Sequence, residues 1–76
     1  MITLNQIQSN LAMAIIKYSG MTHRQIANLV GVSKSCIDNY IKGNRIPTLD
    51  IFANLCKILD ESADYLLGLE ENESNI

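Results

Sequence analysis

Five polar residues recur at helical steps in the middle of the chain: Lys34, Ser35, Asp38, Asn39 and Lys42. Residues three and four positions apart are neighbours on the surface of an α-helix. Asn can pair with adenine N6 and N7, Lys can donate to guanine O6 and N7, and Ser can bond to either base. Asp can accept from cytosine N4, and lysines four positions away would screen its charge from phosphates. These residue types predict a helix face that contacts bases in DNA.

The elements around this face strengthen the prediction, because a polar helix face alone is usually only solvated. Thr22 and Gln25 have the spacing of a capping box, and Ile26, Leu29 and Val30 predict the buried side of a short helix that ends at Gly31.

Ser33 then caps a helix over residues 34–42 that buries Ile37, Tyr40 and Ile41. Only about three residues separate the two helices, which predicts a helix-turn-helix unit over about residues 22–42. In that geometry the second helix enters the major groove while the first lies across the DNA backbone.

Phosphate contacts are predicted around the same unit. The amino ends of the helices that follow Thr22 and Thr48 offer free backbone N–H groups. Side chains that add donors are Thr22, His23, Arg24, Lys42 and Arg45. A solvated first-turn histidine is the alternative for His23.

Three further helices complete an all-α, compact five-helix fold. The first spans about residues 4–18, starts at Thr3 and Gln6, and buries one stripe of side chains: Ile7, Leu11, Ala14, Ile15 and Tyr18. The fourth is capped by Thr48 and buries Ile51, Phe52, Leu55, Ile58 and Leu59. The fifth starts at Ser62, turns Tyr65 and Leu66 inward and ends before Gly68. We expect one domain over residues 1–69 and a flexible acidic tail over residues 70–76.

Length and charge agree with a small binding domain. A chain of 76 residues with 47% apolar and 18% charged residues supports one core and leaves no room for a second, sensing or dimerising module. The net charge of −2 is unevenly distributed, since residues 1–59 carry all six bases and two acids whereas residues 60–76 carry six acids. A weakly basic body with an acidic end favours a polyanionic partner or an interaction tail.

Other classes are disfavoured. Cys36, Cys56 and the single histidine cannot form a four-ligand zinc site, so we expect buried thiols in a reducing compartment, no metal and no cofactor. No base and orienting residue stand at a recognisable spacing from a nucleophile, so we expect no enzyme activity. No apolar run approaches the ~20 residues of a membrane span, and the amino end lacks the basic start of a secretory signal, which predicts a cytoplasmic protein with no membrane partner.

Residues 21–69 resemble the lambda-repressor-like, Cro/cI-type helix-turn-helix family. The matching features are Ile26 and Ala27, the Gly31-Val32-Ser33 turn, Ile37, Gly43, Pro47 and the closing Ser-Ala-Asp-Tyr-Leu-Leu-Gly. The resemblance implies a domain that binds double-stranded operator DNA, usually as a homodimer, in bacterial or phage transcription control. By position it places base contacts at Ser33, Lys34, Ser35 and Asn39, and it places His23 where many members have a Gln that touches phosphate.

The resemblance also carries two packing expectations. Ala27 falls where the family needs a small residue at the crossing of the second and third helices. Ile16 and Ile41 fall where many members have a buried Arg–Glu pair, and apolar residues can replace such a pair without loss of stability. We therefore expect Ile16 to contact Ile41 in the core.

Two functions remain open on the sequence alone. The first is a sequence-specific DNA-binding transcriptional regulator, a repressor or phage-type switch, that dimerises through apolar residues near the fifth helix (Leu67, Leu69, Ile46). The second is a protein-binding modulator of another repressor, acting as an antirepressor or corepressor, which the acidic end and Asp38 on the reading face favour. Specific DNA binding by the protein alone would distinguish the first from the second.

Overall fold

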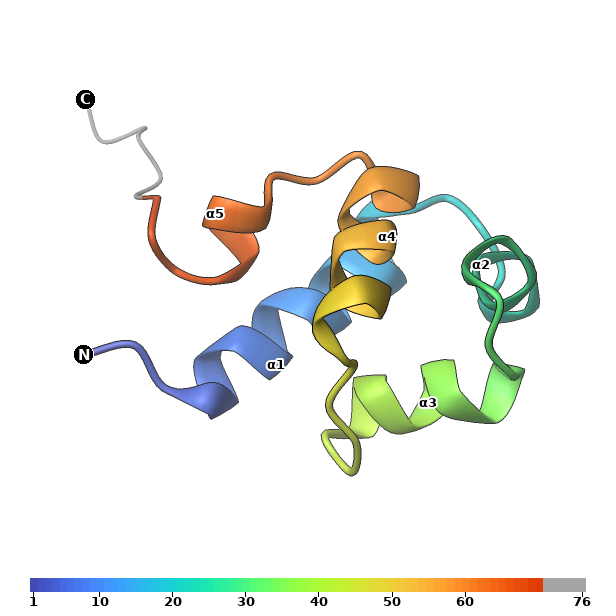
Figure 1. Cartoon of the computed structure of the whole chain (residues 1–76), viewed down its shortest axis with the longest axis horizontal. Coiled ribbons are helices and arrows are strands. Elements are labelled where there is room, and N and C mark those ends of the chain that lie inside the picture. Colours follow the sequence, from blue (N-terminus) through green and yellow to red (C-terminus); the bar gives the residue numbers. More distant parts are fainter. Residues whose placement is uncertain (71–76) are drawn as a thin grey trace.

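The structure, a computed structural model, describes residues 1–70, and every regular element in that range is helical (Figure 1). The elements are α1 (Leu4–Met13), η1 (Ala14–Tyr18), α2 (His23–Val30), α3 (Lys34–Lys42), α4 (Leu49–Leu59) and α5 (Ala63–Leu66). The predicted all-α fold with five α-helices is confirmed. The predicted acidic tail lies outside the described residues except for Glu70.

The first helix departs from the predicted continuous helix over residues 4–18. After Met13 the chain continues as one π-helical turn, η1, instead of regular α-helix. Leu11, Ala14 and Ile15 are buried. Ile16 follows the buried Ala14 and Ile15 in this π-helical turn, and its side chain is 58% exposed. The expected core contact between Ile16 and Ile41 is therefore wrong, and so is the alignment of this helix with the family's arginine position.

Side chains cap most of the helices where the sequence predicts caps. Thr22 accepts a hydrogen bond from Gln25 N (3.1 Å) while Gln25 Oε1 accepts from Thr22 N (2.9 Å), which completes a capping box. Ser33 and Ser62 accept from the backbone N–H three residues further on. Thr48 occupies the N-cap of α4, but its hydroxyl donates to the Asp50 carboxylate instead of capping the backbone.

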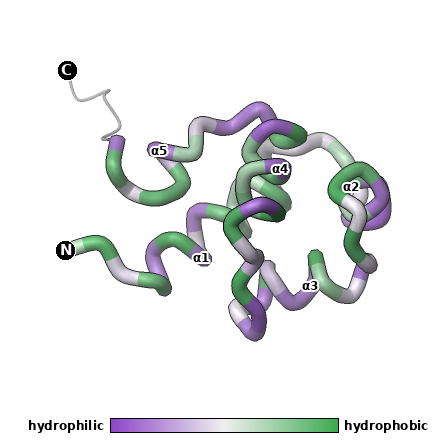
Figure 2. Tube along the Cα trace, in the orientation of Figure 1, coloured by the Kyte–Doolittle hydropathy of each residue, from purple (hydrophilic) through white to green (hydrophobic). Residues whose placement is uncertain are grey.

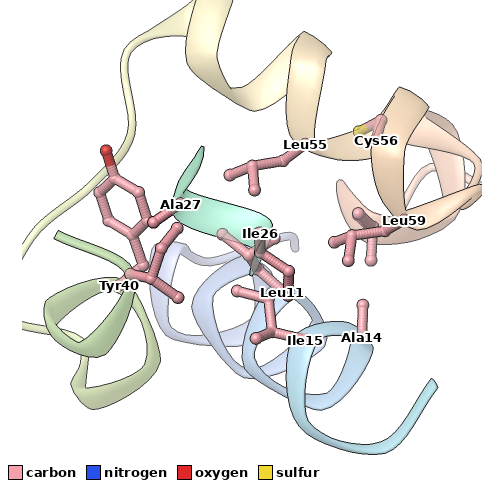
Figure 3. Close-up of a cluster of buried hydrophobic side chains, with 11 residues drawn as sticks. Leu11, Ala14, Ile15, Ile26, Ala27, Tyr40, Leu55, Cys56 and Leu59 are labelled. Atoms are coloured by element: carbon pink, nitrogen blue, oxygen red, sulfur yellow. The ribbon is translucent and has the colours of Figure 1, made fainter. Parts of the chain in front are cut away.

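The core brings one face of every α-helix together. Ile26 of α2 meets Leu11 of α1 and Leu55 of α4 in this cluster (Figure 3). The full set of buried side chains is Leu11, Ala14, Ile15, Ile26, Ala27, Ile37, Tyr40, Leu55, Cys56, Leu59 and Leu66. Burial of this apolar surface is what holds the short helices in place.

Besides Ile16, two further residues predicted for the core lie outside it. Leu29 is 62% exposed because Ile26, Ala27 and Val30 define the inward side of α2, and Leu29 lies about 200° around from Ala27. Tyr65 is 37% exposed because α5 is a single turn, and the fully buried Leu66 takes its inward position.

The carboxyl end of the described chain packs near the amino end. Asn10 Nδ2 of α1 donates to the carbonyl of Leu66 in α5 (3.1 Å), and the side chain of Ile2 lies beside Gly68. Figure 1 shows α5 and the amino terminus on the same side of the molecule, away from α2 and α3. No helix within residues 1–70 is both long and apolar enough to cross a membrane.

Candidate nucleic-acid interface

A tight turn sets α3 at a steep angle to α2. Gly31 adopts the left-handed conformation (φ +88°), and the N–H groups of Gly31 and Val32 both donate to the carbonyl of Ala27 (2.8 and 3.0 Å). Ala27 itself is 1% exposed. In Figure 1, α2 is seen nearly along its axis while α3 lies across the page, as the predicted helix-turn-helix geometry requires.

The start of α2 and the exposed face of α3 meet at Asp38. Oδ1 of Asp38 lies 3.0 Å from His23 Nδ1, and Oδ2 lies 2.8 Å from Lys34 Nζ. Hydrogen bonds from Lys34 first and from His23 second lower the pKa of Asp38. Asp38, the one acid among the predicted contact residues, is thus paired with Lys34, and it also ties α3 to α2.

The loop after α3 is attached to the same helix. Nη1 of Arg45 lies 3.2 Å from the sulfur of Cys36. The pKa of the Cys36 thiol is lowered, mainly by a hydrogen bond with the Ser33 side chain and further by the positive charge of Arg45. The prediction that both cysteines are buried is therefore wrong for Cys36, which is half-buried, and right for Cys56.

The predicted contact residues come from three segments, namely the start of α2, α3 with its N-cap, and the loop after α3, which the His23–Asp38 and Arg45–Cys36 contacts tie together. Figure 2 shows hydrophilic residues interspersed along α3 and in the loop that follows it. Arg24, Lys34, Ser35, Lys42 and Arg45 are exposed, and His23, Asp38 and Asn39 are half-buried. Thr22 and Ser33 are exposed N-cap residues whose oxygens accept backbone N–H groups. A hydroxyl that accepts a hydrogen bond keeps its own O–H to donate.

Two features were missed in the sequence. Gln8 Nε2 of α1 donates to the carbonyl of Gly43 at the end of α3 (3.3 Å), and the Cys36–Arg45 contact positions the loop. Both contacts join residues nine or more positions apart, so no local pattern indicates them. The interface therefore depends on α1 and the loop as well as on the helix-turn-helix unit.

A second surface was also only partly foreseen. A mainly apolar groove runs between α1, the loop before α4 and the end of α5, lined by Leu4, Ile7, Gln8, Leu11, Ile46, Pro47, Leu49, Phe52 and Leu67. Leu49 at its edge is 88% exposed. Helical spacing indicates the exposure of Leu49, because this residue lies about 200° around α4 from the inward-facing Ile51.

The family assignment follows from the order and geometry of these elements together with a family model, described as "Helix-turn-helix", that matches residues 14–66. The chain belongs to this Cro/cI-type helix-turn-helix family. The domain is 35% identical over 52 residues to the HTH-type transcriptional regulator YobD of Bacillus subtilis strain 168, covering 68% of this chain and 46% of that protein. It is 35% identical over 57 residues to the HTH-type transcriptional regulator YqaE of the same strain, covering 75% and 49%.

A solved structure supports the same fold for this helix-turn-helix domain. The SOS-response transcriptional repressor LexA from Eubacterium rectale superposes with a TM-score of 0.75 and 28% sequence identity, covering all of this chain and 81% of that one. The chain spans about half the length of the curated relatives it matches.

Proposed function

We propose that this helix-turn-helix domain is a sequence-specific DNA-binding transcriptional regulator that reads the major groove with α3. One observation supports this most: α3, the start of α2 and the loop after α3 carry four exposed cationic side chains, and the single acid among the predicted contacts is paired with Lys34. The two curated relatives are named as transcriptional regulators and the structural relative as a transcriptional repressor. A repressor is the finer role that the name of the structural relative favours, and a phage-type switch stays a prediction from the sequence.

The base contacts are proposed for the amino-terminal half of α3. Ser35 is exposed at the first turn, and Asn39 lies one turn further along the same face. Lys34 reaches a guanine only by sharing or leaving its contact with Asp38, so Asp38 orients Lys34 as well as offering an acceptor to cytosine. Ser33 joins this set by its position at the N-cap of α3.

The phosphate contacts are proposed to flank the bases. Thr22, His23 and Arg24 stand at the amino end of α2, where N–H groups favour anions. Lys42 ends α3, and Arg45 follows it in the loop. Each such cation makes binding weaker at higher salt, because a bound phosphate releases counterions.

The test is selection of a binding site from a pool of random duplexes, followed by anisotropy titrations at two salt concentrations. Asn39→Ala should lower the binding free energy by about 1–3 kcal/mol at the selected site and change it little on other sequences. Lys42→Ala should weaken binding to all DNA sequences alike. It should also reduce the slope of log affinity against log salt concentration by about one. Lys57→Ala, near the far end of α4, is the matched charge control and should change neither.

A different outcome would favour the other candidate function. If the protein alone selects no sequence and instead forms a stoichiometric complex with a repressor, the regulator proposal is wrong and the protein is a modulator of that repressor. The exposed apolar rim of the groove would then be the first surface to examine.

We also propose a homodimer that joins two domains through the groove, so that two α3 helices reach half-sites about 34 Å apart. The groove includes Leu67 and Ile46, and Ile46 is 53% exposed. In sedimentation equilibrium with a DNA duplex, the Leu49→Glu protein should bind as a monomer. The control Leu29→Glu, at another exposed leucine on α2, should leave the number of bound protein chains unchanged. A wild-type protein that binds palindromic DNA only as a monomer would contradict the dimer.

A further inference from the structure

The contact between His23 and Asp38 links the first residue of α2 to the middle of α3. The two atoms, Nδ1 and Oδ1, are 3.0 Å apart, and the side chains are 36% and 31% exposed. Lys34 holds the other carboxylate oxygen at 2.8 Å. The imidazole is therefore oriented by α3, and its ring is partly exposed at the amino end of α2.

This contact determines which ring nitrogen carries the proton when the imidazole is neutral. Lys34 and His23 lower the pKa of Asp38, so its carboxylate is ionised around neutral pH and can only accept hydrogen bonds. Nδ1 of His23 must then be the donor. A neutral imidazole has a single N–H, so Nε2 is left with a lone pair and cannot donate to a phosphate oxygen.

Protonation of the ring changes both its charge and its donor pattern. The imidazolium keeps the Nδ1–H bond to Asp38 and gains a donor at Nε2. The ring then has a positive charge and a free N–H donor, like the cationic side chains that we propose as phosphate contacts. The amino end of α2 disfavours a cation, and the ionised Asp38 opposes that effect.

The ion pairs around His23 and Asp38 are confined to α2 and α3 within residues 1–70. Asp38 is the charged partner of His23, and Lys34 is the second charged partner of Asp38; both lie on α3. α4 also packs on α2, but its Asp50 and Lys57 form no ion pair with His23 or Asp38 within residues 1–70, and neither does Lys17 of η1. Arg24, the next residue of α2, adds an exposed guanidinium beside the pair.

We propose that His23 is a proton-dependent phosphate contact, held by Asp38 in the tautomer that cannot donate to DNA until the ring is protonated. DNA affinity therefore rises as the pH falls through the range in which histidine gains its charge. This inference rests on the proposed DNA-binding function, and it makes that function sensitive to pH near neutrality.

The first experiment measures binding to a mixed-sequence duplex of about 20 base pairs, two helical turns. Anisotropy titrations at low salt are run at about pH 6 and about pH 8, on either side of the ordinary histidine pKa of about 6.5. The wild-type protein should bind about two- to fivefold more tightly at the lower pH, as expected for one exposed charge contact. His23→Gln should bind equally at both pH values, because the Gln amide donates at both.

The second experiment reads the tautomer without DNA. The chain has one histidine, so its ring ¹⁵N chemical shifts are unambiguous. The free protein at about pH 8 should carry the proton on Nδ1, and Asp38→Asn should restore a population protonated on Nε2.

The outcomes separate this inference from the function it rests on. Binding that is equally tight at both pH values, or a neutral ring protonated on Nε2 in the wild type, would overturn the inference and leave the regulator proposal standing. Absence of binding at either pH would overturn both. The His23→Gln comparison isolates the contribution of His23 to any change of binding with pH.

Discussion

The guanidinium of Arg45 lies 3.2 Å from the thiol sulfur of Cys36, while Cys56, the other cysteine, is buried in the core. Hydrogen bonding by Ser33 and the charge of Arg45 lower the pKa of Cys36, whereas burial raises the pKa of Cys56. The two thiols of this small domain therefore differ in both access and ionisation.

We predict that iodoacetamide alkylates Cys36 first at mildly alkaline pH, because the thiolate is the nucleophile. Cys56 should react only as fast as the protein unfolds. Peptide mass spectrometry over time measures both rates. Arg45→Gln should slow the reaction of Cys36 and leave Cys56 unaffected; equal rates for the two thiols would contradict the structure.

The crossing of α2 and α3 predicts a strong size limit at Ala27, which is 1% exposed. Ala27→Leu should lower the free energy of unfolding by about 1–3 kcal/mol, because the added atoms overpack the crossing. Urea unfolding measures the loss. Ala53→Leu, at an exposed position of α4, should stay within about 0.5 kcal/mol of the wild type.

The end of α4 predicts a stabilising substitution. Asp60 is the C-cap and has φ +56°, the left-handed conformation that disfavours residues with a Cβ. Asp60→Gly should raise the free energy of unfolding by about 0.5–1 kcal/mol, since the relief of strain exceeds the added chain entropy. Urea unfolding of the two proteins side by side measures the gain.

Gly31→Ala is the converse test of the same effect. Gly31 has φ +88°, and the space that a Cβ would occupy there is open, so the substitution should cost about 1–2 kcal/mol through backbone strain alone. If thermal unfolding shows no loss for Gly31→Ala, the turn does not require the left-handed conformation.

Asp38 predicts a pH dependence of stability with a definite sign. Its pKa is lowered in the folded state below the ordinary value of 3.8, so its stabilising contribution is present above that value and is lost as the pH falls through the folded pKa. The wild type should be more stable than Asp38→Asn at pH 7, and the difference should close below about pH 3.8. Chemical unfolding at a series of pH values measures it, and a difference that is constant with pH would refute the pairing.

Local signals predicted the helix-turn-helix unit almost completely. The residues Thr22, Gly31, Ser33 and Gly43 mark helix ends through short-range hydrogen bonds and backbone preferences, which act over a few residues and so are visible in sequence. The inward positions of α3 and α4 followed from helical periodicity for the same reason.

The predictions of burial were wrong where burial depends on which distant residues a side chain contacts. Ile16 and Leu29 are apolar residues next to a buried stripe, and periodicity alone left their side of the helix open. The π-helical turn at Ala14–Tyr18 and the one-turn length of α5 were not predicted, since neither has a distinct local signature.

The sequence by itself determined an all-helical domain, the place of its turns and the residue types of one polar face, because capping, glycine conformation and apolar spacing are local properties. Only the tertiary structure decided that His23 meets Asp38 across the turn and that Arg45 folds back onto Cys36. Those contacts exist because core packing brings distant segments within hydrogen-bonding distance. They turn a set of polar residues into paired groups, in which an acid that would repel DNA holds a lysine and a histidine in place.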